Sequence, residues 1–214
     1  MNRYVLLGGG GFALELYTYI KDDGGEVVGY YAPEESVELK NLIEWLGDER
    51  LISPDKLCRD AEYLIAARLI KIRLSMIEFI KKNNLKAGTF IHSEAFVSSL
   101  IELGKGAVAF PRAMLTGNAK AGDFLFADSL SIISHGDVIG NNVVIGPAAT
   151  ICGDCNIGDN CSFGVNSAVL PGTRIGSNSE ITIGTFPRKI VDEGSTIVSK
   201  PGVNIGIALN KNFN

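Results

Sequence analysis

IISHGDVIGNNVVIGPAATICGDCNIGDNCSFG, residues 132–164, repeats a six-residue pattern that indicates how the C-terminal part of the chain folds. Stepping by six from its isoleucines in both directions gives sixteen apolar positions in unbroken register, and glycine directly follows many of them. The positions are Ile91, Val97, Leu103, Ala109, Leu115, Ala121, Ala127, Ile133, Ile139, Ile145, Ile151, Ile157, Phe163, Val169, Ile175 and Ile181. Such a run predicts one repeating structural unit over more than a third of the chain.

A small residue usually stands four places after each apolar position, which is the second feature of the repeat. The small residues are Ala95, Ala107, Ala113, Ala119, Ser131, Ala149, Cys155, Cys161, Ser167 and Thr173. One bulky inward residue, one small inward residue and a glycine at the turn are typical of a parallel β-helix built from hexapeptides. Three hexads make one triangular coil, so residues 91–186 are expected to form about five coils.

The first ninety residues follow a different pattern, in which strands alternate with helices. Strands are predicted at Tyr4–Leu7, Glu26–Tyr31 and Leu64–Ala67, and helices at Phe12–Lys21 and Ile70–Asn83. This alternation predicts a small parallel sheet in a Rossmann-like α/β unit. We therefore expect two domains: residues 1–88, and a β-helix with a C-terminal tail at residues 89–214.

The composition of the 214 residues limits the classes of partner. The net charge of −4 gives no overall basic field for nucleic acid or an acidic membrane surface. No apolar run approaches the roughly 18 residues of a membrane span, and the apolar stretch at the N-terminus is too short for a signal peptide. We expect a cytoplasmic protein that binds neither nucleic acid nor membrane.

The cysteines do not form a metal-site pattern. Cys152, Cys155 and Cys161 lie inside the hexad repeat, and Cys58 stands alone. With only two histidines in the chain, a zinc site would depend almost entirely on these thiolates. We interpret them as small buried apolar residues and expect no metal.

The turn GGGGFALEL (Gly8–Leu16) follows the first predicted strand and opens the first predicted helix. Gly8, Gly10 and Ala13 fit the pattern G-x-G-x-x-A, which lets a phosphate approach the backbone at a helix N-terminus. Nicotinamide binding also needs an acidic residue at the end of the second strand, and here Glu34 comes late. We expect a sugar or sugar nucleotide at this turn instead, bound by Gly8, Gly10, Gly11 and Phe12.

The order of these two parts resembles one family of bacterial sugar acyltransferases. GGGGFALEL, FIHSEAFVS (Phe90–Ser98), IISHGDVIG (Ile132–Gly140) and FGVNSAVLPG (Phe163–Gly172) carry the resemblance, which covers nearly the whole chain. The family comprises sialic acid O-acetyltransferases and N-acetyltransferases of nucleotide-linked amino sugars. It implies a left-handed β-helix, acetyl-CoA as the acyl donor, and a homotrimer with active sites between neighbouring β-helices.

A histidine is the expected general base, because its unperturbed pKa lies near neutral pH. The chain offers His92 and His135. His135 comes two residues after the inward Ile133, so its side chain is expected to project outwards, and it aligns with the catalytic histidine of the resembling family. His92 follows the inward Ile91 at the seam between the domains, and we interpret it as structural.

The group that orients His135 is left open by the sequence. In the resembling family an acidic residue commonly follows the histidine, but here Gly136 does. Asp137 occupies an inward hexad position, where a carboxylate is costly unless paired. Asp128 stands where the family usually has asparagine, and it is the other candidate for contacting the acceptor or the imidazole.

The resemblance also implies where the acyl donor binds. The backbone N–H of Gly153 is the candidate oxyanion donor. Gly153, Gly164, Gly184 and Thr185 are expected along the coenzyme A groove. Its phosphates are expected near Arg188, Lys189 and Lys200.

The function that these features predict is acetyl transfer from acetyl-CoA to the amine of a nucleotide-linked amino sugar, in bacterial surface glycan biosynthesis. The departures at Phe12, where the N-acetyltransferases often have histidine, and at Ala32-Pro33, where they have two aspartates, leave the nucleotide open. O-acetylation of sialic acid or a related free sugar is the alternative. A non-catalytic β-helix used for assembly is a third reading, and it requires His135 to be idle.

Overall fold

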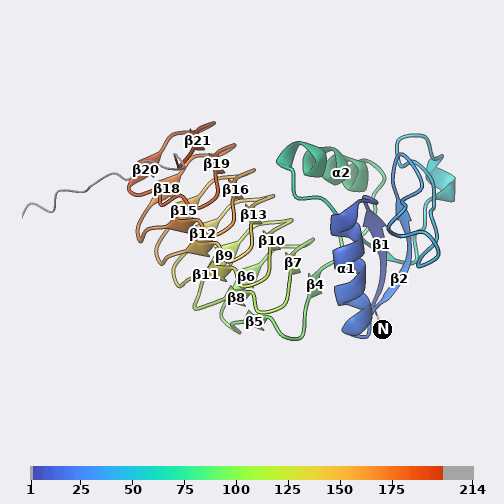
Figure 1. Cartoon of the computed structure of the whole chain (residues 1–214), viewed down its shortest axis with the longest axis horizontal. Helices are drawn as coiled ribbons and strands as arrows, with labels where there is room; N and C mark the ends of the chain where they lie inside the picture. The colour runs from blue at the N-terminus through green and yellow to red at the C-terminus, as the bar shows by residue number, and fades with distance from the viewer. Residues whose placement is uncertain (1, 200–214) are drawn as a thin grey trace, which may run out of the picture.

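A computed structural model describes residues 2–199 of the chain. Residues 90–197 form a parallel β-helix of left-handed type with about six turns (Figure 1). Its three faces are parallel sheets, and equivalent residues pair 18 positions apart, as in Ile132 with Thr150. The hexad register from Ile91 to Ile181 is confirmed, and the predicted five coils extend by one.

The strands of the three faces are short and follow one another in rotation. Face 1 contains β4 (Phe90–Ile91), β7 (Val108–Ala109), β10 (Phe126–Ala127), β13 (Val144–Ile145), β16 (Ser162–Phe163), β19 (Glu180–Ile181) and β21 (Thr196–Ile197). Face 2 contains β5 (Phe96–Val97), β8 (Met114–Leu115), β11 (Ile132–Ile133), β14 (Thr150–Ile151) and β17 (Ala168–Val169). Face 3 contains β6 (Glu102–Leu103), β9 (Lys120–Ala121), β12 (Val138–Ile139), β15 (Asn156–Ile157), β18 (Arg174–Ile175) and β20 (Ile190–Val191). We name the turns corner 1–2, corner 2–3 and corner 3–1 after the faces that they join.

The last coil is shorter than the others. Arg174 pairs with Ile190 and Glu180 with Thr196, so the spacing falls to 16 residues. The backbone hydrogen bonds along face 2 keep their regular spacing up to the bond from the Leu170 N–H to the Pro187 carbonyl, 3.1 Å. The two missing residues fall between Pro187 and Lys189, so the six-residue step still reaches the buried Pro187 and fails only after it.

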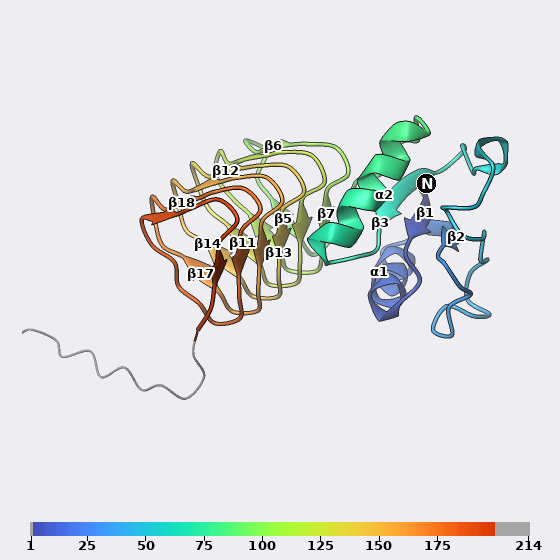
Figure 2. The ribbon, with the colours of Figure 1, turned by 90° about the horizontal axis from the view of Figure 1, so that it is seen from above.

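Residues 2–89 form a small α/β unit at the end of the β-helix where the chain enters it (Figure 2). Its sheet has three parallel strands in the order β2-β1-β3. The strands are β1 (Arg3–Leu7), β2 (Glu26–Tyr31) and β3 (Glu62–Ile65), and the helices are α1 (Gly11–Asp22), α2 (Ile70–Lys82) and the 3₁₀ helix η1 (Pro54–Lys56). The predicted alternation of strands and helices is confirmed, with the third strand two residues earlier than expected. Two α-helices and this small sheet do not establish the Rossmann-like domain that we expected, which stays a prediction.

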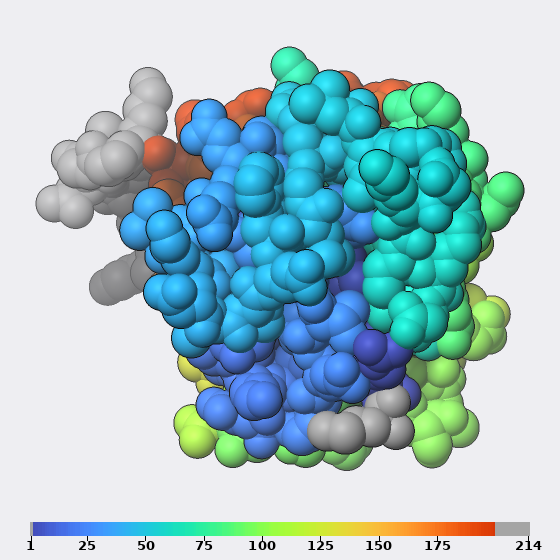
Figure 3. Space-filling view, turned by 90° about the vertical axis from the view of Figure 1, so that its right-hand side faces the viewer, coloured from blue at the N-terminus to red at the C-terminus, as the bar shows by residue number. Residues whose placement is uncertain are grey.

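Aromatic side chains hold the α/β unit against face 1. The Phe12 ring of α1 lies 5.6 Å from that of Phe110 and 5.1 Å from that of Phe126, centroid to centroid. Seen from the outer side, the α/β unit covers most of the β-helix behind it (Figure 3). The outer surface of face 1 is therefore core at its first coils, and it continues the interior of the α/β unit.

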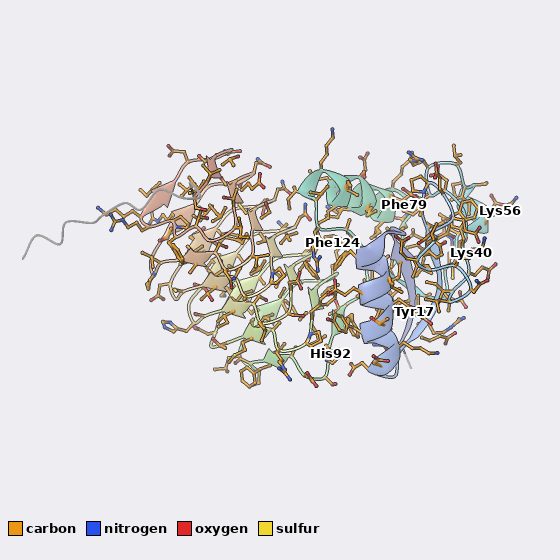
Figure 4. The ribbon with its side chains drawn as sticks, in the orientation of Figure 1. Tyr17, Lys40, Lys56, Phe79, His92 and Phe124 are labelled. Carbon is orange, nitrogen blue, oxygen red and sulfur yellow. The ribbon has the colours of Figure 1, made fainter. Side chains whose placement is uncertain are left out.

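A buried arginine makes the second contact between the two parts. Arg73 of α2 is 2% exposed and donates to Asn142 Oδ1 at 2.8 Å, to the Phe124 carbonyl at 2.6 Å and to the Ala67 carbonyl at 3.0 Å. Burial lowers the pKa of the Arg73 guanidinium to about 10, so it stays charged at neutral pH. Phe124 lies between the β-helix and α2 (Figure 4). One cation thus fixes α2 against corner 3–1.

None of the helices within residues 2–199 has the length and apolar character needed to cross a membrane.

Candidate active site

His135 stands on the open surface of corner 2–3, in the turn that follows β11. Its side chain is 71% exposed, as its outward hexad position predicts. The equivalent residues in the coils on either side are Gly117 and Gly153. A Cβ at Gly117 would lie 2.7 Å from His135 Cβ, and one at Gly153 would lie 2.5 Å from His135 Cε1. The two glycines leave the space that the histidine occupies, and the imidazole lies against the backbone of Gly153.

The carboxylate nearest to His135 is Asp154, which the sequence reasoning missed. Asp154 Oδ1 lies 3.9 Å from His135 Nδ1, and the Asp154 N–H donates to the His135 carbonyl at 3.0 Å. Asp154 belongs to the next coil, directly above Gly136. A Cβ on Gly136 would collide with Asp154 Oδ1. The stacking interval of the hexads was the signal that could have found it, because 154 is 136 plus 18.

Asp137 points into the β-helix, as its hexad position indicates, and its side chain is buried. Its two oxygens accept hydrogen bonds from the N–H groups of Ser134 and Cys155, both at 2.9 Å. Burial raises the pKa of the Asp137 carboxyl to about 6, although the two hydrogen bonds from backbone N–H groups act to lower that pKa. The carboxylate joins the turn that carries His135 to the coil above.

The raised pKa of Asp137 leads to a stability prediction with a definite sign. The folded state holds this proton more tightly than the unfolded chain, so the contribution to stability is complete below about pH 4 and is lost as pH rises through about 6. We expect Asp137→Asn to remove this component, worth on the order of 2 kcal/mol. Urea unfolding of both proteins across that pH range measures it. Identical pH dependence of the free energy of unfolding in the two proteins would contradict the prediction.

Asp128 lies at corner 1–2, on the other side of face 2 from His135. Its side chain is 1% exposed; Oδ1 accepts the Ser129 N–H at 2.8 Å, and Oδ2 lies 2.8 Å from an Arg68 nitrogen. Burial raises the pKa of the Asp128 carboxyl. Within one protomer the structure does not bring Asp128 and His135 together, so Asp128 does not orient the imidazole of its own chain.

Arg68 connects Asp128 to the glycine-rich turn. Its guanidinium carbon lies 4.3 Å from the centre of the Phe12 ring, and a nitrogen lies 3.0 Å from Glu15 Oε2. Phe12 thus packs against the rings of Phe110 and Phe126 and against the guanidinium of Arg68. Sequence periodicity gave no signal for Arg68, because it lies in the loop between β3 and α2.

Gly10 and Gly11 are the open part of the glycine-rich turn. A Cβ added at either would meet no atom within 4 Å, whereas one at Gly8 would lie 2.6 Å from the Ala66 carbonyl oxygen. The first turn of α1 has no side-chain cap and no acidic residue. Gly8 therefore serves chain packing, and Gly10 and Gly11 present free backbone.

The residues expected along the coenzyme A groove fall on two edges of face 2. Gly153 lies at corner 2–3, and the exposed Arg188 and Lys189 continue that edge into the last coil. Gly164, Gly184 and Thr185 lie at corner 1–2. The Thr185 hydroxyl is buried against the Thr182 carbonyl at 2.6 Å. Lys200 lies outside the described residues.

Two hollows flank the join between the two parts. One, of about 560 Å³, is lined by Arg68, Leu69 and Ile70 and by residues of the later coils that include Pro147 and Gly164. The other, of about 590 Å³, lies between the end of α1 and the first coils and includes His92.

His92 lies on the first coil near the end of α1 (Figure 4). Its Nδ1 accepts the Glu94 N–H at 3.1 Å, and its ring packs edge-on against Tyr19. These contacts agree with a structural residue.

Two of the three cysteines within the repeat behave as packing residues, whereas Cys152, like Cys58, is only partly buried, so the interpretation of all four as buried residues is wrong for these two. Cys155 and Cys161 are free and buried, and burial raises the pKa of each thiol, to about 11 for Cys155. Among residues 2–199 there is no group of three or more potential ligands placed to hold a metal ion.

No family model matches the chain. The bifunctional protein GlmU of Clostridioides difficile (strain 630) is 27% identical over 124 residues, 56% of this chain. The chain spans only about a quarter, 27%, of the length of that curated relative.

Solved structures match over nearly the whole chain. The acetyltransferase domain of PglB from Neisseria gonorrhoeae FA1090, in complex with acetyl coenzyme A, has a TM-score of 0.81 at 22% identity, covering 93% of this chain and 97% of that one. A histidine variant of perosamine N-acetyltransferase from Caulobacter crescentus, in complex with CoA and GDP-perosamine, has a TM-score of 0.83 at 18% identity, covering 94% and 95%. The chain therefore shares the fold of these two acetyltransferases, with matches that cover 93% and 94% of it.

Proposed function

We propose that the protein transfers an acetyl group from acetyl-CoA to the amine of a nucleotide-linked amino sugar, with His135 as the general base. The observation that carries the proposal is the exposed imidazole of His135, set between Gly117 and Gly153. The shared fold supports it, because the matched structures were solved with acetyl-CoA, or with CoA and GDP-perosamine.

The proposed reaction needs no covalent enzyme intermediate. The amine nitrogen attacks the thioester carbonyl, His135 Nε2 takes the proton that the nitrogen loses, and the oxyanion forms next to the backbone of Gly153. The Gly153 N–H donates to no other group within residues 2–199, so it is free for this role. Collapse of the tetrahedral intermediate expels the CoA thiolate. The thiolate takes the proton from the imidazolium, which returns His135 to its neutral form.

The acceptor nucleotide is proposed to lie at the glycine-rich turn. Gly10 and Gly11 leave room for a phosphate against the backbone, and the uncapped N-terminus of α1 favours an anion there. In this scheme the α/β unit, Rossmann-like in its strand-turn-helix start, holds the acceptor, and the β-helix holds the acetyl donor. Arg68, partly exposed beside this turn, supplies a cation.

We also propose a homotrimer, because the outward residues of face 2 form an apolar surface that the single chain leaves uncovered. Its outward residues include Phe96 and Met114, which are 56% and 43% exposed, and Ile132. By contrast, the α/β unit covers the first coils of face 1, and face 3 carries charges such as the Lys120–Glu102 ion pair at 2.8 Å. Apolar surface of this kind favours association with a second copy.

A threefold arrangement around face 2 also completes the site. If face 2 points toward the threefold axis, corner 2–3 of one copy meets corner 1–2 of its neighbour. His135 and Gly153 of one protomer then face Gly164, Gly184 and Thr185 of the next. This arrangement reunites the two groups of residues that a single chain keeps on opposite edges.

The trimer is tested by light scattering coupled to size exclusion. We expect three times the chain mass of 22.9 kDa for the wild type and a smaller species for the Phe96→Glu/Met114→Glu variant. Asn156→Glu, a charge placed on the outer side of face 3, is the matched control and should remain trimeric. A wild-type mass of 22.9 kDa at micromolar concentration would contradict the proposal.

Product analysis decides between an amide and an ester. The protein is incubated with acetyl-CoA and a panel of GDP- and UDP-linked amino sugars and free sialic acid, and each product is treated with alkaline hydroxylamine. An acetyl group on nitrogen survives this treatment, whereas an O-acetyl ester is cleaved. We expect a resistant product from an amino sugar. A cleavable product from sialic acid alone would replace the proposed N-acetylation by O-acetylation.

A further inference from the structure

Resting on the proposed function, we propose that Asp154 is the positioning residue for the catalytic imidazole and acts from the coil above His135. It would hold the Nδ1–H of His135 and leave Nε2 as the basic nitrogen. In this arrangement the orienting carboxylate comes from a different coil, 19 residues further along the chain.

The backbone already fixes Asp154 beside the histidine. Its N–H donates to the His135 carbonyl at 3.0 Å, and its φ of 62° turns the chain at the corner. Oδ1 lies 3.9 Å from His135 Nδ1, so a shift of about 1 Å by two exposed side chains forms the hydrogen bond. The turn that carries the His135 ring and the turn that carries the Asp154 carboxylate are therefore joined by a backbone hydrogen bond.

Gly136 makes room for this contact. Its φ is 70°, and a Cβ there would collide with Asp154 Oδ1. Any other residue at this position would push the Asp154 carboxylate away from its present place. Gly136 and Asp154 are therefore coupled. Because Gly136 has no side chain, the Asp154 side chain can occupy the space beside His135.

The other carboxylates near the turn are engaged elsewhere. Both oxygens of Asp137 face the N–H groups of Ser134 and Cys155 inside the β-helix. In the coil below, the Asn118 side chain is neutral and accepts the Gly136 N–H at 3.0 Å. Within residues 2–199, Asp154 is the one carboxylate that comes as close as 3.9 Å to a ring nitrogen of His135.

The contact has a chemical consequence at both ring nitrogens. A neutral imidazole donates from one nitrogen and accepts at the other, and a carboxylate beside Nδ1 favours the Nδ1–H tautomer. Nε2 then keeps the lone pair that takes the amine proton. The carboxylate also stabilises the imidazolium that forms at that moment.

The first test reads the tautomer directly. The chain has only two histidines, so ¹⁵N-histidine labelling gives two sets of ring signals, and His92→Asn assigns them. We expect Nδ1–H for His135 in the wild type and a shift toward Nε2–H in Asp154→Asn. Asparagine tolerates the left-handed φ, so this variant keeps the turn. An unchanged His135 tautomer in Asp154→Asn would overturn the proposal.

The second test is kinetic and includes a rescue. Asp154→Asn should lower kcat by about ten- to a hundredfold with little change in KM for acetyl-CoA. Asp192→Asn, at an exposed aspartate in the last coil, is the charge-matched control and should keep the wild-type kcat. The Gly136→Asp/Asp154→Gly double variant moves the carboxylate down one coil and should recover most of the loss. A kcat for Asp154→Asn within about twofold of the wild type would overturn the proposal.

The two tests separate this proposal from the proposed function. The NMR measurement needs no substrate, so it decides whether Asp154 holds Nδ1–H even if no acceptor is acetylated. Absence of transfer by the wild type would contradict the proposed function alone.

Discussion

His135→Ala should lower kcat by about a hundred- to ten-thousandfold, because the reaction loses its general base. The trimer mass and the affinity for acetyl-CoA should remain close to those of the wild type. The side chain is 71% exposed and lies beside two glycines, so its removal leaves no buried cavity. Steady-state kinetics with the true acceptor measure the effect. A variant that kept more than about a third of the wild-type kcat would exclude His135 as the base.

Two further variants make this result specific. His92→Ala removes the other imidazole of the chain, and it should cost stability rather than turnover, because its ring packs on Tyr19. Gly153→Ala keeps the imidazole but places a Cβ 2.5 Å from its Cε1, so the ring must move. We expect Gly153→Ala to lower kcat in the same direction as His135→Ala while the protein remains folded.

Arg73→Met should have the largest effect on stability, about 2–4 kcal/mol in the free energy of unfolding. The substitution leaves three acceptors without their donor: the buried Asn142 Oδ1 and Phe124 carbonyl, and the partly buried Ala67 carbonyl. Lys81→Met, on the exposed side of the same helix, is the matched control and should change the free energy by less than about 0.5 kcal/mol. Urea unfolding measures both. Equal midpoints for the two variants would contradict the role of Arg73.

The same arginine begins a ladder of amides along corner 3–1. Asn142 donates to Asn160 at 3.0 Å, and Asn160 donates to Asn178 at 3.1 Å. Asn178 donates to Glu193 Oε1 at 3.1 Å. Loss of Arg73 therefore removes the first donor in a series of side-chain hydrogen bonds that reaches the last coil. We expect faster amide hydrogen exchange at corner 3–1 as a result.

The β-helix could be predicted from the sequence because its rule is local. Every apolar position from Ile91 to Ile181 obeys the six-residue step, and the inward position of Asp137 followed from the same count. The rule stops where two residues are missing from the last coil, and the strands β20 and β21 were not foreseen there. A deletion inside a repeat removes the only signal that the prediction used.

The candidate site could be predicted only in part, because some contacts join residues that no period connects. Asp154 was within reach of the hexad rule, since it stacks on Gly136, but the sequence pattern drew attention only to Asp128 and Asp137, the aspartates next to His135 in the repeat or matching the resembling family. Arg68 was out of reach, because a loop of the α/β unit brings it to Asp128 and Phe12. Its place depends on the packing of α1 and α2 against face 1, which composition and spacing do not encode.

Acetyl transfer by His135 is tested most directly by the rate of CoA thiol release from acetyl-CoA, measured with and without a GDP- or UDP-linked amino sugar in the wild type and in His135→Ala. We expect release that depends on the amino sugar, with one acetyl group appearing on the sugar nitrogen for each thiol released. We also expect that His135→Ala loses this release while still binding acetyl-CoA. Release that is independent of every acceptor, or that is equal in the two proteins, would contradict acetyl transfer by His135.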